Sequence, residues 1–265
     1  ISTYLLQNHT ANDIQSDGLT HSSIWCIVKD NQGTLWLGTY FGGVNYFNPE
    51  YEIYTRYSYS SNEKKGLSNP VVGRTIEDKD DNLWIGTEGG GLNYYNRRTR
   101  EFKWYRPQEG RNSISHNNVK ALYYDADKEI IWIGTHLGGL NKLDIRSGHF
   151  THYRMEEGNP NTLPSDIIRD IIPYKSLLII ATQNGVCLFD PANGQCQQLF
   201  KDSKEGKSIK MVADVTFDSE GTLWIAATGE GVFSYRFNTC KLTNYRHDAT
   251  NPNSLSNNNV NNITQ

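Results

Sequence analysis

The protein has 265 residues and a formal net charge of −3, and its composition is rich in tyrosine, tryptophan and glycine. This length allows one large domain with a sizeable core, and a net charge near zero argues against binding nucleic acid through bulk charge. No apolar run approaches the length of a membrane span, so we expect no direct membrane insertion by this chain. The first residues lack the basic start and apolar stretch of a signal peptide. Because the chain does not begin with methionine, we expect it to be a piece of a longer protein.

In chain order, one short motif recurs through the sequence. It reads "LWLGT" at 35–39, "LWIGT" at 83–87, "IWIGT" at 131–135, "LIIAT" at 178–182 and "LWIAAT" at 223–228. The second residues of these motifs follow one another at intervals of 48, 48, 47 and 45 residues: Trp36, Trp84, Trp132, Ile179 and Trp224. A regular period of this length is typical of repeat architectures.

Each unit has the same internal plan. A first strand ends in an Asp-rich turn, at Asp30, Asp78, Asp125 and Asp218, and the "LWIGT" strand follows at once. A Gly-rich turn then leads to a third strand such as "GLNYY", and another turn leads to a fourth such as "FKWY". Four short antiparallel strands per unit of this length predict the blades of a β-propeller, whose stacking covers both faces of the apolar "LWIGT" strand.

The predicted fold is therefore all-β, with 1–265 forming one portion of a β-propeller. The five complete blades are expected at about 18–65, 66–112, 113–161, 162–207 and 208–253. Residues 1–17 supply at most an outer strand, and residues 254–265 repeat the start of a blade but stop before any "LWIGT". Because an open row of blades leaves unpaired edges, we expect the remaining blades in a longer parent protein.

The unit "LSNPVVGRTIEDKDDNLWIGTEGGGLNYYNRRTREFKWY" resembles the two-component regulator propeller repeat. That repeat fills the extracytoplasmic sensor region of hybrid two-component histidine kinases, best known from gut Bacteroides. The resemblance covers residues 18–265. The fourth unit departs from it with "LLIIAT" and "QNG", and the fifth with "IAAT".

The resemblance implies seven-bladed propellers, often in tandem, followed by an immunoglobulin-like domain, a membrane span and a kinase. It implies a periplasmic sensor of glycans or oligosaccharides, with no enzymatic activity and no cofactor in this chain. The partners it implies are the glycan, the remaining blades and a second propeller of the parent protein. A homodimer is a further partner that the sequence leaves open.

The sequence gives little indication of catalytic or metal-binding chemistry. The sequence contains no nucleophile-elbow, zinc-protease, P-loop or Rossmann motif, so no catalytic residue is assigned. The run "DKDDN" at 78–82 reads as a solvated turn with Asx hydrogen bonds rather than a calcium site, so no metal is expected. Glu88 and Glu230 leave open a propeller lyase or glycosidase, and a protein-interaction scaffold is a further alternative.

The four cysteines, Cys26, Cys187, Cys196 and Cys240, form no C-x-x-C pair. A zinc or thioredoxin-like site is therefore not expected. Their spacing gives no disulfide framework. A core of this size needs no covalent link, so free and mostly buried thiols are favoured over a disulfide.

Residues that repeat with the blades form the scaffold, which assigns the motif tryptophans to the core. Residues that vary from blade to blade on one rim are the candidates for binding. The turns between second and third strands supply Tyr40, Phe41, Glu88, His136 and Gln183. The segments leading into the first strands supply Trp25, Arg74, Lys120 and Arg169, with Asp170 and Asp214 beside them. This mixture suits an oligosaccharide, especially one with carboxylates or sulfates. The competing locations are the opposite face, formed by the Asp-rich turns, and a boundary with a second propeller.

Overall fold

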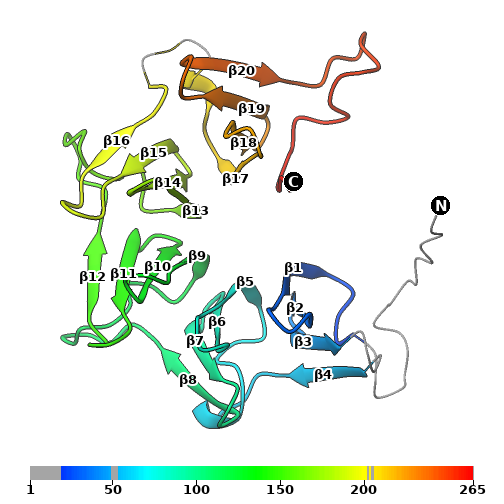
Figure 1. The fold of residues 1–265 in the computed structure, drawn as a ribbon, viewed down its shortest axis with the longest axis vertical. Coiled ribbons are helices and arrows are strands. Elements are labelled where there is room, and N and C mark those ends of the chain that lie inside the picture. Colours follow the sequence, from blue (N-terminus) through cyan, green and yellow to red (C-terminus); the bar gives the residue numbers. More distant parts are fainter. Residues whose placement is uncertain (1–18, 49–52, 202, 204–205, 265) are drawn as a thin grey trace. The chain divides into compact units, whose positions relative to one another are not determined.

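The computed structural model describes residues 19–48, 53–201, 203 and 206–264. The predicted outer strand within 1–17 lies outside the described residues. The chain divides into two compact units, Ile1–Val119 and Lys120–Gln265. Each unit consists of four-stranded antiparallel sheets in which neighbouring strands are also neighbours in sequence (Figure 1).

The first unit contains two sheets. Their strands are β1 (Ile24–Lys29), β2 (Leu35–Thr39), β3 (Gly43–Asn48) and β4 (Ile53–Tyr57), then β5 (Val72–Glu77), β6 (Leu83–Thr87), β7 (Gly91–Asn96) and β8 (Glu101–Tyr105). A short 3₁₀ helix, η1 (Glu63–Lys65), precedes β5.

The second unit contains three sheets, and its boundary falls at the start of β9. The strands are β9 (Val119–Asp125), β10 (Ile130–Thr135), β11 (Leu140–Asp144) and β12 (Phe150–Tyr153); β13 (Ile168–Tyr174), β14 (Leu177–Thr182), β15 (Gly185–Phe189) and β16 (Cys196–Gln198); and β17 (Val212–Phe217), β18 (Leu223–Ala227), β19 (Gly231–Arg236) and β20 (Lys241–Tyr245). The helix η2 (Gly206–Ser208) precedes β17. The prediction of five four-stranded propeller blades, numbered 1 to 5 in chain order, is confirmed.

The hydrophobic cores lie between successive blades. In the first unit, Trp36 and Val44 of blade 1 share one buried cluster with Val72 and Ile85 of blade 2. In the second unit, one cluster joins blades 3 and 4, and another joins blades 4 and 5. This arrangement explains why the motif strand is apolar on both faces: every residue of β6 is buried.

The glycine of the motif is explained by the close approach of the next blade. A Cβ atom built on Gly38 would lie 2.7 Å from a methyl carbon of Val72, and one on Gly86 would lie equally close to Val119. The motif threonine closes the following turn, because the Thr39 and Thr87 hydroxyls donate to the carbonyls of Gly43 and Gly91.

The Asp-rich turns bind the motif tryptophans. The Asp78 carboxylate accepts hydrogen bonds from the backbone N–H groups of Asp80 and Asn82 and from Trp84 Nε1, at 3.0, 2.9 and 3.0 Å. The same bond joins Asp30 to Trp36 and Asp218 to Trp224. The turn is an Asx turn, as predicted, but the expectation that it is solvated is wrong for Asp30 and Asp78. Both residues are buried, because the carboxylate turns inward to satisfy the indole N–H.

Candidate functional site

The inner strands of four blades carry a β-bulge at equivalent positions. The strand register shifts between Ile24 and Cys26, between Val72 and Thr75, between Ile168 and Asp170 and between Val212 and Asp214. The extra residues at these shifts include Trp25, Arg74 and Arg169, three of the predicted binding residues. Bulges re-aim side chains and are common beside functional sites. The fold therefore provides a repeated position whose side chain is free to vary.

The rim of blade 1 brings three of the predicted residues together as an aromatic cluster. The rings of Trp25 and Tyr40 are stacked, with centroids 5.4 Å apart and planes 8° apart. Phe41 packs edge-on against Tyr40 at 4.3 Å, and His21 lies on the other side at 6.4 Å. Trp25 remains 52% exposed and Phe41 59% exposed. An open aromatic surface of this kind can bind another flat or apolar face.

Two turns of this rim hold bulky apolar residues in the left-handed backbone region. Phe41 has φ 67° in blade 1 and Leu137 has φ 76° in blade 3, whereas blade 2 has Gly89 at the same place of the turn. Both side chains are exposed. A positive φ is unfavourable for bulky residues, and such strain clusters at functional sites. Neither side chain gains core packing that would offset it.

A shallow groove of about 260 Å³ lies beside Phe41. Its walls come from the turn after β2, from the end of β4 and the segment after it, and from the segments that precede β1 and β5: Thr20, Phe41, Gly42, Arg56, Ser58, Tyr59 and Pro70. Arg56 and Tyr59 are exposed. The groove offers one cation, several hydroxyl groups and two aromatic rings, and its lining contains no carboxylate.

The other predicted binding residues of the first unit, Glu88 and Arg74, are half-buried and lie against neighbouring strands. Glu88 is half-buried, its N–H donates to the Val71 carbonyl at 3.0 Å, and it forms a backbone bridge with Asn118. Arg74 is half-buried on β5 and lies close enough to blade 1 to act on Cys26. Burial raises the pKa of the Cys26 thiol, and the Arg74 charge opposes that rise.

In the second unit two of the predicted residues hold Ile167, at the start of blade 4. His136 forms a backbone bridge with Ile167, and the Gln183 N–H donates to the same residue's carbonyl. Lys120, His136, Arg169 and Gln183 are all half-buried.

Asp170 and Asp214 do not face a ligand. Both are buried, and they accept from the backbone N–H groups of Val215 and Ile263 in the segment that follows, at 3.3 and 2.8 Å. The expectation that they line the rim is therefore wrong.

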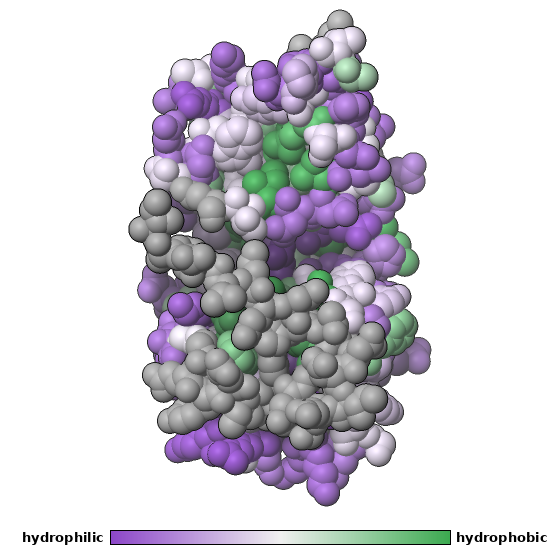
Figure 2. Space-filling model, turned by 90° about the vertical axis from the view of Figure 1, so that its right-hand side faces the viewer, coloured by the Kyte–Doolittle hydropathy of each residue, from purple (hydrophilic) through white to green (hydrophobic). Residues whose placement is uncertain are grey.

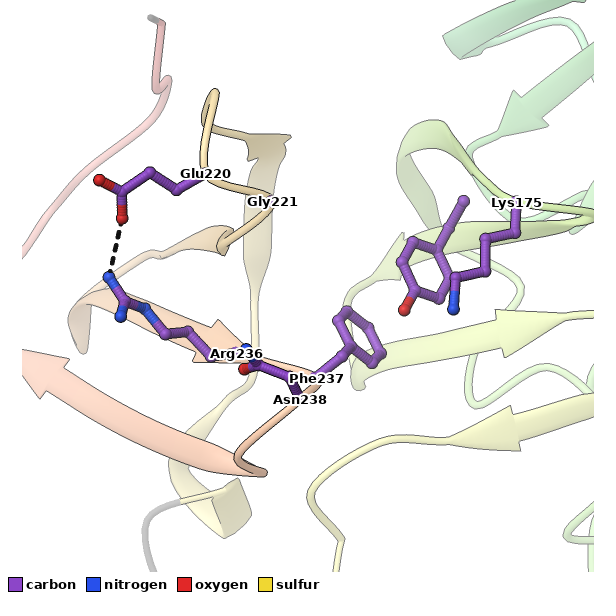
Figure 3. Close-up of a pocket in the computed structure, with 7 residues that line it drawn as sticks. Lys175, Glu220, Gly221, Arg236, Phe237 and Asn238 are labelled. Carbon is purple, nitrogen blue, oxygen red and sulfur yellow. Dashed lines mark hydrogen bonds and ion pairs between the residues drawn. The ribbon is translucent and has the colours of Figure 1, made fainter.

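A second groove lies in blades 4 and 5 at the turns between first and second strands, the face that the sequence offered as a competing location, although none of its residues was predicted (Figure 3). It measures about 510 Å³ and is lined by Tyr174, Lys175, Glu220, Gly221, Arg236, Phe237 and Asn238. The rings of Tyr174 and Phe237 stack at 4.4 Å, Lys175 lies over Tyr174, and Arg236 is paired with Glu220 at 3.0 Å. The sequence feature that could have indicated this groove is the turn "PYKS" of blade 4, at a place where the other blades have aspartate.

The remaining surface offers little other chemistry. Figure 2 shows a largely hydrophilic face on which apolar side chains emerge in small areas. Among the described residues, no three histidine, cysteine or acidic side chains gather in a way that could hold a metal ion. Glu230, considered for acid/base chemistry, is paired with Arg246 at 2.6 Å. Within the described part of the chain, no helix has the length and apolarity to cross a bilayer.

Comparison with known proteins identifies the repeat. The sequence profile of the two component regulator propeller family matches residues 18–41, 66–89 and 113–136, which are the inner strand, motif strand and following turn of blades 1 to 3. The fold is thus that of a β-propeller portion, and blades 1 to 3 match the two component regulator propeller repeat that the sequence resembles. No curated protein sequence matches the chain.

Solved structures share the fold. The extracellular domain of the putative hybrid two component system BT3049 from B. thetaiotaomicron is 23% identical with a TM-score of 0.71, and the alignment covers 92% of this chain and 37% of that one. The extracellular domain of BT4673 from the same organism is 21% identical with a TM-score of 0.65, covering 93% and 40%. PorZ of Porphyromonas gingivalis, a component of the type-IX secretion system, is 17% identical with a TM-score of 0.61, covering 91% and 41%. The chain spans about two-fifths of the length of these structures.

Proposed function

We propose that this chain is part of the extracytoplasmic, periplasmic sensor region of a hybrid two-component signalling protein. In this proposal it binds an oligosaccharide or other glycan fragment and relays binding to a kinase outside the chain. The regulator propeller repeat supports the sensor role, and the extracellular sensor domains among its structural relatives support the location. A second propeller stays a prediction that follows from the same family resemblance, and a homodimer stays one that the sequence leaves open.

The observation that carries the ligand proposal is the exposed aromatic cluster on the rim of blade 1. The Trp25 ring is held flat against Tyr40, so its orientation is fixed before a ligand arrives. A pre-ordered ring loses little conformational freedom on binding. The apolar face of a sugar ring can pack on it, while Arg56 in the adjacent groove can pair with a carboxylate or sulfate.

The groove composition favours binding over glycoside hydrolysis. Glycosidases generally use two carboxyl groups, separated by about 5 to 9.5 Å, on either side of the scissile bond. The groove beside Phe41 has hydroxyl groups and a guanidinium in its lining but no aspartate or glutamate. We therefore propose that the chain is not an enzyme.

The test is calorimetry with the wild-type protein against a panel of neutral, carboxylated and sulfated oligosaccharides. Trp25→Ala should weaken binding of the best ligand at least tenfold, because loss of an aromatic hot-spot residue typically removes about 2 kcal/mol or more. Phe41→Ala should weaken it as well. Met155→Ala is the control, because it removes an exposed apolar side chain that lines neither groove.

Unchanged affinity in a folded Trp25→Ala variant would reject this rim. If Phe237→Ala abolished binding instead, the ligand site would lie in the groove of blades 4 and 5. New reducing or unsaturated ends after incubation with a polysaccharide would overturn the non-enzymatic assignment.

A further inference from the structure

Blade 4 lacks both the motif tryptophan and the Asp–Trp hydrogen bond that blades 1, 2 and 5 have. Ile179 occupies the position of the motif tryptophan of blades 1, 2, 3 and 5. The turn between β13 and β14, which contains Lys175, has no aspartate. The Asp–Trp hydrogen bond of blades 1, 2 and 5 is therefore impossible here. Its outer strand β16 has only three residues, whereas β4, β8 and β20 have five. This outer strand has the fewest ladder bonds to keep it in place.

Two cysteines occupy neighbouring strands at this weak edge. Cys187 lies on β15 opposite Gln198, and Cys196 lies on β16 opposite Phe189, so the two cysteines are diagonal neighbours across the ladder. Their sulfur atoms are 3.3 Å apart. Both are buried, with exposed fractions of 0% and 4%, in the apolar cluster between blades 3 and 4.

The geometry is close to that of a covalent link. A disulfide has its sulfurs about 2.05 Å apart. The two sulfurs therefore need to approach by about 1.3 Å. Diagonal neighbours across a ladder are typically about 7–8 Å apart, so the bond requires a shift of the short edge strand β16 in addition to side-chain rotation. Cys26 and Cys240 lie in blades 1 and 5, so blade 4 alone has two cysteines in its sequence.

All four cysteines are free in this structure, as the sequence led us to expect. We propose, against that expectation, that Cys187 and Cys196 are joined by a disulfide bond when the protein folds in an oxidising compartment. The location is taken from the proposed function, but the chemistry of the pair does not depend on it. One thiolate attacks a disulfide-bonded oxidant, such as a protein disulfide donor or oxidised glutathione, and releases one oxidant thiol. The second thiolate attacks the resulting mixed disulfide, forms the Cys187–Cys196 bond and releases the other oxidant thiol.

Burial sets the time at which the bond can form. Burial raises the pKa of the Cys187 thiol, and its hydrogen bond with Cys196 raises it further, so the reactive thiolate is scarce once β16 has docked. Oxidant access is also blocked in the folded blade. The bond should thus form during folding, and refolding protein should oxidise faster than folded, reduced protein.

The bond would give blade 4 a covalent link within the blade, where blades 1, 2 and 5 have the Asp–Trp hydrogen bond. It closes a ten-residue loop, 187–196, that contains the turn between β15 and β16. A cross-link of this size restricts the unfolded chain and holds the short outer strand against its neighbour.

The test refolds the reduced protein with a mixture of reduced and oxidised glutathione and then alkylates it in denaturant before peptide mapping. We expect Cys26 and Cys240 to be alkylated and Cys187 and Cys196 to be recovered as one linked peptide pair that only a reductant releases. The oxidised protein should melt roughly 5 °C or more above the reduced protein. Cys26→Ser with Cys240→Ser is the matched control and should retain the link and the shift.

Alkylation of all four cysteines after exhaustive treatment with oxidised glutathione would overturn the proposal. So would a link that joins either cysteine to Cys26 or Cys240. A linked protein that melts no higher than the reduced one would contradict the stabilising role of the bond. A failure of glycan binding leaves these outcomes unchanged, so the two proposals are tested separately.

Discussion

At the scale of single residues, the motif tryptophan combines an apolar ring with an N–H group that needs an acceptor. In blades 1, 2 and 5 an aspartate six positions earlier in the chain supplies that acceptor. In blade 3, Asp125 precedes Trp132 by seven positions, and Trp132 Nε1 is buried with no hydrogen-bond partner among the described residues. One inserted residue in the turn therefore separates a satisfied tryptophan from an unsatisfied one.

Trp84→Ala should destabilise the protein by roughly 3–5 kcal/mol, because it leaves a cavity where a ring that is 1% exposed packs against Tyr94 and Tyr105. Chemical denaturation of the variant measures this loss. Trp84→Phe compared with Trp132→Phe separates packing from hydrogen bonding. The first should cost about 1–3 kcal/mol more, since only it removes one of the hydrogen-bond donors of a buried carboxylate. A loss below about 1 kcal/mol for Trp84→Ala would place the ring outside the core.

The acid sensitivity of the first unit should depend on Asp30. Burial alone would raise the pKa of Asp30, but the Trp36 N–H, the Thr34 N–H and the Arg97 charge outweigh it, so its pKa lies below the ordinary value. A carboxyl with a lowered pKa contributes stability above its unfolded pKa of about 3.9 and loses it as pH falls through the folded value. Denaturation measured from neutral pH down to about pH 2 should show this loss.

Asp30→Asn supplies the control for that measurement. It should lower stability at neutral pH, because the pair with Arg97 at 2.8 Å is lost, and it should flatten the decline in acid. Glu77 contributes a pH dependence of the opposite sign. Burial raises the pKa of Glu77, so its protonation in acid favours the folded state. An acid decline of the same steepness in wild type and variant would show that Asp30 is not the group responsible.

At the scale of strands and turns, the glycine that begins the third strand of blades 1, 2 and 5 is fixed by geometry. Gly43, Gly91 and Gly231 have φ near +80°. A Cβ atom on Gly91 would lie 2.2 Å from the Tyr105 carbonyl oxygen, at the end of the neighbouring strand β8. The hairpin and the outer strand therefore both require a residue without a side chain.

Gly91→Ala should destabilise the protein by roughly 3 kcal/mol or more, because it combines an unfavourable backbone conformation with a collision against backbone. Gly110→Ala is the matched control: its φ is +69°, but nothing lies within 4 Å of the added Cβ. That variant should lose only about 1–2 kcal/mol. Equal losses in denaturation would show that the close approach of β8 has no part in the effect.

At the scale of the whole chain, the repeat period predicts the number of blades and the position of nearly every strand, because each blade needs the same apolar pattern to pack on its neighbours. It also predicts the core position of the motif tryptophans. The stacking of Trp25 on Tyr40 follows from a bulge that no residue pattern announces. The groove around Tyr174 and the Cys187–Cys196 pair depend on contacts between positions that do not repeat. The period therefore carries no information about them.

The segment 254–264 docks on blade 5 through backbone contacts that recur within each unit. The Asn258 carbonyl accepts from the N–H groups of Gly229 and Gly231 at 3.1 and 3.0 Å. The Asn117 carbonyl does the same for Gly89 and Gly91 between blades 2 and 3. The backbone N–H of Ile263 reaches Asp214, as that of Val215 reaches Asp170. This segment is thus part of the support of blade 5.

A chain ending at residue 253 should therefore have a less protected blade 5. Hydrogen exchange should accelerate at Gly229 and Gly231, whose N–H groups lose their acceptor, while Gly43 in blade 1 keeps its bond to Pro70 and its exchange rate. Asn258→Ala should have a smaller effect. It removes the side-chain bond to the His247 N–H at 2.7 Å but retains the carbonyl that accepts from the glycines. Unchanged exchange at Gly229 and Gly231 in the shortened chain would show that the segment does not stabilise the blade. Faster exchange at those two positions alone would show that the segment stabilises only the turn between β18 and β19.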